Sequence, residues 1–339
     1  PLTVTLDALN AKLDLLNEKC IVNHSCYFGA TNNNYTEFDK LDKHRVCGIK
    51  LFMGSSTGNM LVDKMNSLLN IFNGTDMLIA AHCEDQETIK NNIEKYKQKY
   101  KGADDIPVSA HPSIRSVPAC YASSELAVRL AKIAGARLHI LHVSTAKELQ
   151  LFSDEPLANK NITAEACVAH LLFTLTHYNS LGARIKCNPA VKRKTDREAL
   201  RTAVNSGLID VIATDHAPHL LSEKEGGALK AMSGMPMIQF SLVSMLELVD
   251  EGVFSLETVV QKMCHAPARI YGICQRGYIR EGYQADLVLV RSNSPWEVTT
   301  DKILSKCGWS PLEGHTFNWK VEKTFANGHL IYNGNTVND

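Results

Sequence analysis

Apolar runs that end abruptly on polar residues recur along this chain, and they predict buried strands. The run from Val211 to Ala213 is followed by Asp215 and, a little further on, by His219. Continuous apolar runs of this length suit strands that are buried on both faces, as in a parallel sheet. Because α/β folds place their chemistry just past the carboxyl ends of such strands, the segment 209–219 predicts a catalytic strand end.

Strand and helix patterns alternate over residues 1–275. The predicted strands cover residues 20–30, 46–53, 77–82, 137–143, 161–166 and 209–215, and residues 184–189 are expected to form a short strand end. The predicted helices cover residues 5–16 with Thr5 as N-cap, 118–135 with Gly135 as the stop, 195–207, 236–250 and 255–264. This alternation predicts βαβ units and a parallel sheet of about six strands, two fewer than a closed eight-stranded barrel has.

The pattern changes at Gly277. Segments 282–290 and 321–332 have strand character, and an Asn-Gly turn lies within the second one. The sequence therefore predicts two domains. Residues 1–276 would form an incomplete (β/α) barrel that carries the catalytic site, and residues 277–339 would form the C-terminal part of a small β domain.

Composition narrows the class of protein. The chain has 339 residues, of which 45% are hydrophobic and 21% charged, and its formal net charge is zero. This balance argues against binding to nucleic acid or to a membrane through a basic surface. No apolar run approaches the ~18 residues of a membrane span. The ten cysteines are dispersed, without a C-x-x-C pair, which favours reduced thiols in a cytoplasmic protein.

Four predicted strand ends carry potential metal ligands, namely Lys50, His82, His142 and Asp215. Imidazole and carboxylate are ordinary zinc ligands. A single histidine at a strand end is more often structural, and His139 is expected to be such a case.

Lys50 is the least expected ligand of the four. Lysine with its ordinary pKa is neutral in only about one molecule in 2,500 at pH 7, so it is a poor ligand. A buried neutral amine, however, can add carbon dioxide and form an anionic carbamate that bridges two metals.

Several segments together resemble the dihydroorotases of the amidohydrolase superfamily. Ala213-Thr-Asp215-His-Ala-Pro-His219 is similar to their D-x-A-P-H motif, and Gly48-Ile-Lys50-Leu-Phe to the strand with the carboxylated lysine. Further matches are Ala81-His82-Cys-Glu-Asp, Leu141-His142-Val-Ser-Thr, the N-P loop in Lys186-Cys-Asn188-Pro, and the C-terminal segment that begins at Gly277. The resemblance covers nearly the whole chain, with the motifs in family order.

This resemblance implies a TIM-like (β/α)8 metal-dependent hydrolase barrel with a small C-terminal β segment. It implies a zinc-dependent enzyme that hydrolyses the cyclic amide of dihydroorotate reversibly to N-carbamoyl-aspartate, in pyrimidine biosynthesis, through a metal-bound hydroxide. Two Zn²⁺ ions would be bridged by carboxylated Lys50, and His82 and His142 would hold one of them. Asp215 would bind metal and carry the proton, while Asn188 and His219 would contact this small-molecule substrate. A homodimer is possible.

The family's H-x-H motif, the substrate arginine after it and the strand that follows have no match in residues 1–40. The first barrel strands are therefore expected to be absent from this sequence. Two alternatives remain open. One is another cyclic amidohydrolase, a hydantoinase or an allantoinase, which shares the barrel and its metals. The other is a metal-free, inactive paralogue that serves as a structural partner. The retention of all four candidate ligands argues against the inactive paralogue.

Overall fold

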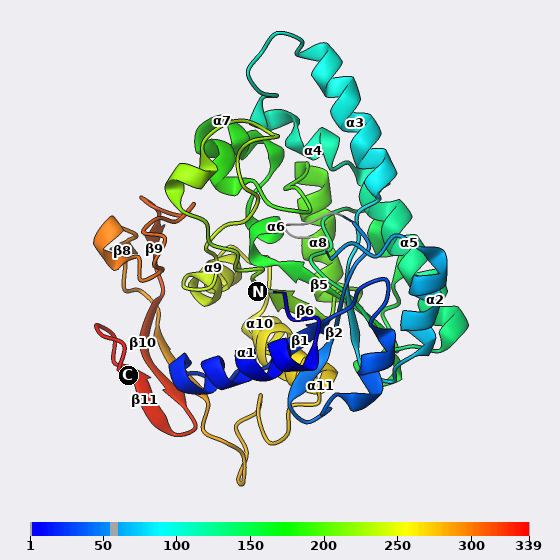
Figure 1. The fold of residues 1–339 in the computed structure, drawn as a ribbon. Coiled ribbons are helices and arrows are strands. Elements are labelled where there is room, and N and C mark those ends of the chain that lie inside the picture. Colours follow the sequence, from blue (N-terminus) through cyan, green and yellow to red (C-terminus); the bar gives the residue numbers. More distant parts are fainter. Residues whose placement is uncertain (1, 55–59, 339) are drawn as a thin grey trace.

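A parallel sheet organises the computed structural model, which describes residues 2–54 and 60–338. Its six strands lie in chain order, each hydrogen-bonded to the next (Figure 1). They are β1 (Cys26–Gly29), β2 (Val46–Phe52), β3 (Ile79–His82), β4 (Leu138–Ile140), β5 (Ile162–Cys167) and β6 (Val211–Ala213). Sequential parallel order with helical crossovers is the arrangement of a TIM-type barrel wall. The predicted fold class is confirmed.

Helices connect the strands and cover the outside of the sheet. Near the start of the chain and in the first crossovers these are α1 (Leu6–Lys19), α2 (Met65–Asn73), α3 (Gln86–Lys99), α4 (His111–Ile114) and α5 (Val117–Ala134). The later ones are α6 (Val168–Leu172), α7 (Tyr178–Leu181), α8 (Lys194–Ser206), α9 (Ser241–Asp250), α10 (Leu256–Val260) and α11 (Ala266–Ile270). α2 packs beside α5, and α6 packs on α8 (Figure 1). No helix in the described part of the chain is long and apolar enough to cross a membrane.

Local signals fixed the ends of several helices correctly. The Thr5 hydroxyl accepts the N–H of Ala8 at 3.2 Å and caps α1, as predicted. Gly135 ends α5 in the left-handed conformation, with φ of 66°, which glycine adopts without steric cost. The predicted helix 255–264 is divided, because α10 passes into a π-helical turn at Gln261–His265.

Two strand predictions were wrong. Of residues 20–30, only Cys26–Gly29 form a strand, because Ile21 and Val22 are exposed and have no neighbouring strand. Residues 184–189 contain no strand. Gly182–Ile185 form a 3-10 helix, and a loop with a cis peptide bond between Asn188 and Pro189 follows it.

The C-terminal part of the chain forms small antiparallel sheets. β7 (Leu287–Arg291), β10 (Lys320–Ala326) and β11 (His329–Tyr332) make one sheet, in which β10 is central. β8 (Trp296–Glu297) and β9 (Thr316–Phe317) make a second. The predicted Asn-Gly turn joins β10 to β11, and Asn327 and Gly328 both have positive φ, as the turn requires. The predicted domain boundary at residue 276 stays a prediction.

A buried ion pair lies at the amino end of β6, just outside the strand. Lys160 Nζ is 2.8 Å from Asp210 Oδ1 and 2.7 Å from the carbonyl oxygen of Gly207. The second oxygen of Asp210 accepts the N–H of Ala164 at 3.0 Å, which ties the entry of β6 to β5. Both charged side chains are almost fully buried, so each depends on the other for solvation.

Asp210→Asn should lower the free energy of unfolding by about 3 kcal/mol, because it leaves the Lys160 ammonium buried without a counter-charge. Urea denaturation followed by circular dichroism measures the change. The double variant Lys160→Met/Asp210→Asn is the matched control and should recover at least half of the loss. A loss below about 1 kcal/mol for Asp210→Asn would show that water solvates the pair as it does a surface ion pair.

Candidate active site

The carboxyl edge of the sheet gathers the four predicted strand-end residues. Lys50 lies near the end of β2, and His82 is the last residue of β3. The parallel register pairs Lys50 with Ala80 and Phe52 with His82, which brings these two strand ends to one level. His142 is the second residue after β4, and Asp215 is the second residue after β6. Both have a positive φ, of 41° and 44° respectively. Non-glycine residues seldom adopt this conformation, and it is often found at functional sites.

Two histidines of this group contact each other directly. His82 Nδ1 lies 3.0 Å from His142 Nε2, and both side chains are buried. Burial lowers the pKa of both imidazoles, and their mutual proximity lowers that of His142 further. Both rings are therefore neutral at physiological pH, which is the state in which imidazole binds metals.

Lys50 and Asp215 interact electrostatically beside this pair. Burial lowers the pKa of the Lys50 ammonium, and the nearby Asp215 carboxylate opposes that change. Asp215 is accessible at the open end of the barrel, yet the surrounding protein desolvates its carboxyl and raises the pKa to about 6, against the effect of Lys50. A lysine with a lowered pKa beside a carboxyl with a raised pKa is typical of catalytic sites.

Two carboxylates that the sequence analysis missed complete the surroundings. Glu165 on β5 accepts the backbone N–H of His142 at 3.3 Å and lies 3.1 Å from His139 Nε2. Glu165 also acts electrostatically on both Lys50 and Asp215. Its position inside a predicted strand gave no sign of this role. His139 also contacts the hydroxyl of Thr163 at 2.8 Å, which agrees with the structural role expected for it.

The second missed carboxylate is Glu84, which is fully buried just past β3. One of its oxygens lies 3.1 Å from His82 Nε2 and also contacts the Arg115 guanidinium. Burial alone would raise the pKa of this carboxyl, but Arg115 and His82 outweigh burial and lower it to about 2. Glu84 stays ionised and faces the ring nitrogen of His82 that points away from His142. The carboxylate thus lies at ion-pair distance from Nε2 of His82, while Nδ1 faces His142.

The chemistry of this group fits a divalent cation such as zinc. Two neutral imidazoles face each other, with His82 Nδ1 and His142 Nε2 turned toward the same point. Within residues 2–54 and 60–338, no three His, Cys, Asp or Glu side chains gather tightly enough to hold one cation. A cation at this pair would therefore need Lys50 or solvent as further ligands, and Lys50 can serve only when it is not an ammonium.

The predicted substrate loop lies against the segment after β6. The N–H of Gly234 donates to the carbonyl oxygen of Lys186 at 2.8 Å, and a Cβ added at Gly234 would meet Ala217 and the ring of His219. Asn188 is half-buried in this loop. The structure thus brings the loop that carries Asn188 and the segment 215–219 to the same edge of the barrel.

His219 is fixed by its own neighbours. Its Nε2 donates to the carbonyl oxygen of Ser233 at 3.2 Å, and its backbone carbonyl accepts the indole N–H of Trp309 at 2.8 Å. His216 accepts the backbone N–H groups of Met237 and Ile238, each at 3.2 Å. His216 is therefore an anchor for the chain after the site.

Segment 222–235 contacts His219 through the carbonyl oxygen of Ser233, and two further side chains, Lys224 and Asp105, hold it. Lys224 Nζ donates to the carbonyl oxygens of Met232 and Gly234, each at 2.6 Å, and of Lys186 at 3.1 Å. Asp105, from the loop after α3, accepts the N–H groups of Gly227, Leu229 and Lys230 at 2.7–3.1 Å. A segment held in this way must break several hydrogen bonds before it can open.

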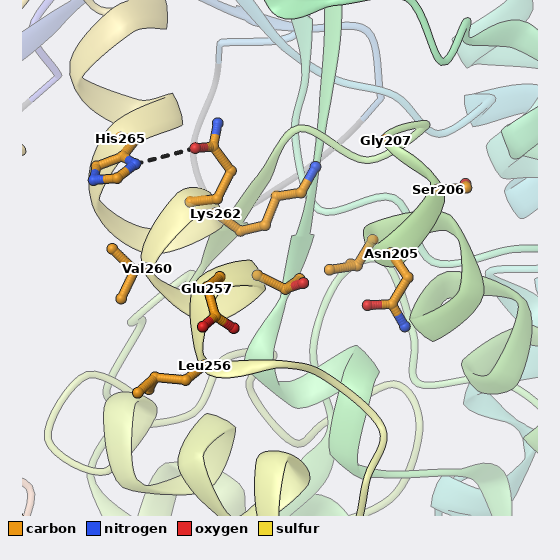
Figure 2. Close-up of a pocket in the computed structure, with 11 residues that line it drawn as sticks. Asn205, Ser206, Gly207, Leu256, Glu257, Val260, Lys262 and His265 are labelled. Carbon is orange, nitrogen blue, oxygen red and sulfur yellow. Dashed lines mark hydrogen bonds between the residues drawn. The ribbon is translucent and has the colours of Figure 1, made fainter.

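A separate cavity of about 650 Å³ lies between the end of α8 and α10 (Figure 2). Its lining includes Leu256, Val260 and the stem of Lys262, whose Nζ donates to the carbonyl oxygen of Ile209 at 2.6 Å. Ile209 precedes β6, whereas Asp215 follows it, so this cavity belongs to the opposite end of the strand. None of the predicted site residues lines it.

Comparison with known proteins agrees with this architecture. Residues 52–331 match the model of the amidohydrolase family. The chain is 30% identical to a dihydroorotase of Halobacterium salinarum over 99% of its own length and 76% of that protein. It is 29% identical to an allantoinase of Bacillus velezensis, over 98% and 73% of the two chains. The L-hydantoinase of Arthrobacter aurescens superposes with a TM-score of 0.92 at 26% identity, over 99% and 76% of the two chains.

Asp105→Ala should loosen segment 226–231, because three backbone N–H groups lose their common acceptor. Hydrogen–deuterium exchange read by mass spectrometry should show these amides exchanging about tenfold faster, which corresponds to about 1.4 kcal/mol of local stability. Asp104→Ala, at an exposed neighbouring position, is the matched control and should leave the exchange unchanged. Equal exchange in both variants would mean that Lys224 and the backbone bonds, such as that from Ala228 N–H to the carbonyl oxygen of Ile106, hold the segment without Asp105.

Proposed function

The chain belongs to the amidohydrolase family, and we propose that it hydrolyses the ring amide of dihydroorotate reversibly to N-carbamoyl-aspartate. The observation that carries this proposal is the contact of two neutral histidines, His82 and His142, beside Lys50 and Asp215 at the carboxyl edge of the sheet. The resemblance of residues 213–219 to the dihydroorotase motif favours this substrate. The reaction would belong to pyrimidine biosynthesis, in the cytoplasm.

Hydrolysis of a ring amide requires a group that transfers the proton, groups that bind the substrate and groups that position them, and the site offers a residue for each role. Asp215 lies at the open end of the barrel, where its carboxylate takes a proton from the attacking water and delivers it to the amide nitrogen that leaves. Asn188 and His219 hold the substrate from the neighbouring loop and segment. Glu84 and Glu165 keep His82 and His142 in place, through the His82 ring and the His142 backbone respectively.

His82 and His142 would hold one zinc ion. Carboxylated Lys50 and Asp215 would be ligands of a second zinc ion beside the first. When bound, such ions supply Lewis-acid polarisation of the carbonyl and lower the pKa of water. The burial that lowers the pKa of the Lys50 ammonium also favours the neutral amine that carboxylation needs.

Charges near Asn188 favour an anionic substrate over a neutral one. Lys186, Lys192 and Lys224 are buried, and their ammonium groups contact carbonyl oxygens or the hydroxyl of Ser144. None of the three forms an ion pair with a carboxylate of a described residue. A unit charge about 8 Å away contributes about 2 kcal/mol at an effective dielectric constant of 20, or roughly 30-fold in affinity. Dihydroorotate carries a carboxylate, whereas hydantoin and allantoin do not.

A substrate comparison tests the proposed function. The purified protein, supplied with zinc and bicarbonate, should open dihydroorotate with a kcat/KM at least about tenfold above that for hydantoin or allantoin, because the local positive charge favours the carboxylate. Loss of the ring absorbance of dihydroorotate measures turnover. A higher kcat/KM for hydantoin or allantoin would assign the chain to that neighbouring activity.

Metal removal tests the role of the histidine pair. Dialysis against a chelator should abolish turnover, and zinc should restore it, because the reaction depends on polarisation of the amide. Elemental analysis after gentle purification should find at least one zinc per chain, and His142→Ala should lower that content. Less than one zinc per chain, together with no turnover after zinc is added, would identify a metal-free, inactive paralogue.

A further inference from the structure

Two buried histidines hold the substrate loop from opposite ends. His111, at the start of α4, places Nε2 2.9 Å from the carbonyl oxygen of Cys187 and 3.1 Å from Asn188 Oδ1. His170, in α6, places Nε2 2.9 Å from the carbonyl oxygen of Pro189. Both side chains are at most 4% exposed. His111 therefore contacts the side chain of Asn188, whereas His170 contacts the carbonyl oxygen of Pro189 and, at 3.8 Å, the sulfur of Cys187.

The partners of these rings fix their protonation. Carbonyl oxygens accept hydrogen bonds and cannot donate them, so Nε2 carries the proton in both histidines. Burial lowers the pKa of His111 to about 3 and that of His170 to about 4, and nearby cations act in the same direction on both. Each ring is thus a neutral donor at physiological pH, and Nδ1 of each is buried without a partner.

This protonation also fixes the amide of Asn188. A neutral Nε2–H can bond the amide oxygen but not the amide NH₂, so the oxygen of Asn188 must face His111. The amide nitrogen then points along the other branch of the side chain. Among the described residues it has no hydrogen-bond partner, and Asn188 is only half-buried. Two N–H donors are therefore left for a ligand.

We propose that His111 is a positioning residue, which orients the Asn188 amide so that its NH₂ group donates to an oxygen of the substrate. This inference rests on the proposed function, because it takes Asn188 as a substrate contact. It goes further in naming the substrate group that Asn188 binds, which is a carbonyl or carboxylate oxygen and not a ring N–H. Without His111 the amide can rotate by 180° and present its oxygen, which repels the same group.

A double-mutant cycle tests this role. His111→Leu should raise KM for dihydroorotate about tenfold with kcat changed less than about threefold, since one hydrogen bond made in the ground state is lost. His111→Gln, whose amide NH₂ can reach the same oxygen, should restore most of the affinity. In an Asn188→Ala background, His111→Leu should have no further effect on KM. Additive effects of His111→Leu and Asn188→Ala would overturn the proposal.

His170→Leu is the matched control. It removes a similar buried histidine that donates to the same loop, but it leaves the Asn188 amide oriented. It should lower the thermal midpoint about as much as His111→Leu does and leave KM within about twofold of the unmutated protein. An equal rise of KM in both variants would mean that the loop backbone alone, and not the Asn188 amide, sets substrate affinity.

A readout that needs no turnover separates this proposal from the proposed function. In ¹⁵N-histidine NMR spectra, His111 should show a neutral Nε2–H ring, and Asn188→Ala should shift its Nε2 resonance but not that of His170. A proton on Nδ1 of His111 would overturn the proposal. If the protein opens hydantoin or allantoin and not dihydroorotate, the dihydroorotase assignment fails, and the same cycle is measured with the substrate that is opened.

Discussion

Parallel strand pairing is the constraint on which the site depends. Strands that run the same way bring all their carboxyl ends to one edge, so residues far apart in sequence meet without any local turn that links them. Lys50, His82, His142 and Asp215 each occupy such an end. This arrangement desolvates the titratable side chains at the strand ends, because little water reaches the last residues of a strand that is buried on both faces. The lowered pKa of Lys50 and of both histidines follows from that burial.

Neutrality is the common chemical result of this burial. The histidine pair and the two loop histidines, His111 and His170, all have lowered pKa values, so each ring offers one donor and one acceptor. Neutral rings can bind a cation or direct a hydrogen bond, whereas protonated rings would only repel neighbouring cations. The fold sustains these neutral groups with charged ones close by, such as Glu84 paired with Arg115. Fixed charges and neutral donors thus lie within one compact site.

The sequence predicted those parts of the structure in which a local pattern changes sharply. The strand ends were visible because an apolar run stops on a polar residue. The helix ends at Thr5 and Gly135 were visible because capping residues have a characteristic chemistry.

Glu165 was missed, since a carboxylate inside a strand pattern gives no sign that its partners come from other strands. Glu84 and Arg115 were missed for the same reason, as they are 31 residues apart in sequence. His111 stands in a polar segment, and only the fold brings it to Asn188. The strand predicted at 20–30 was too long because hydrophobic residues such as Ile21 can also remain exposed.

The contact between His82 and His142 spans 60 residues of sequence, and that separation has a consequence for how the molecule folds. Contacts between distant parts of a chain form only after the entropy cost of closing long loops has been met, and proteins dominated by such contacts fold slowly. The two rings cannot meet until β3 and β4 have paired, and Asp215 joins them only when β6 has been added to the sheet. The site therefore cannot be complete before the strands that carry its residues have paired.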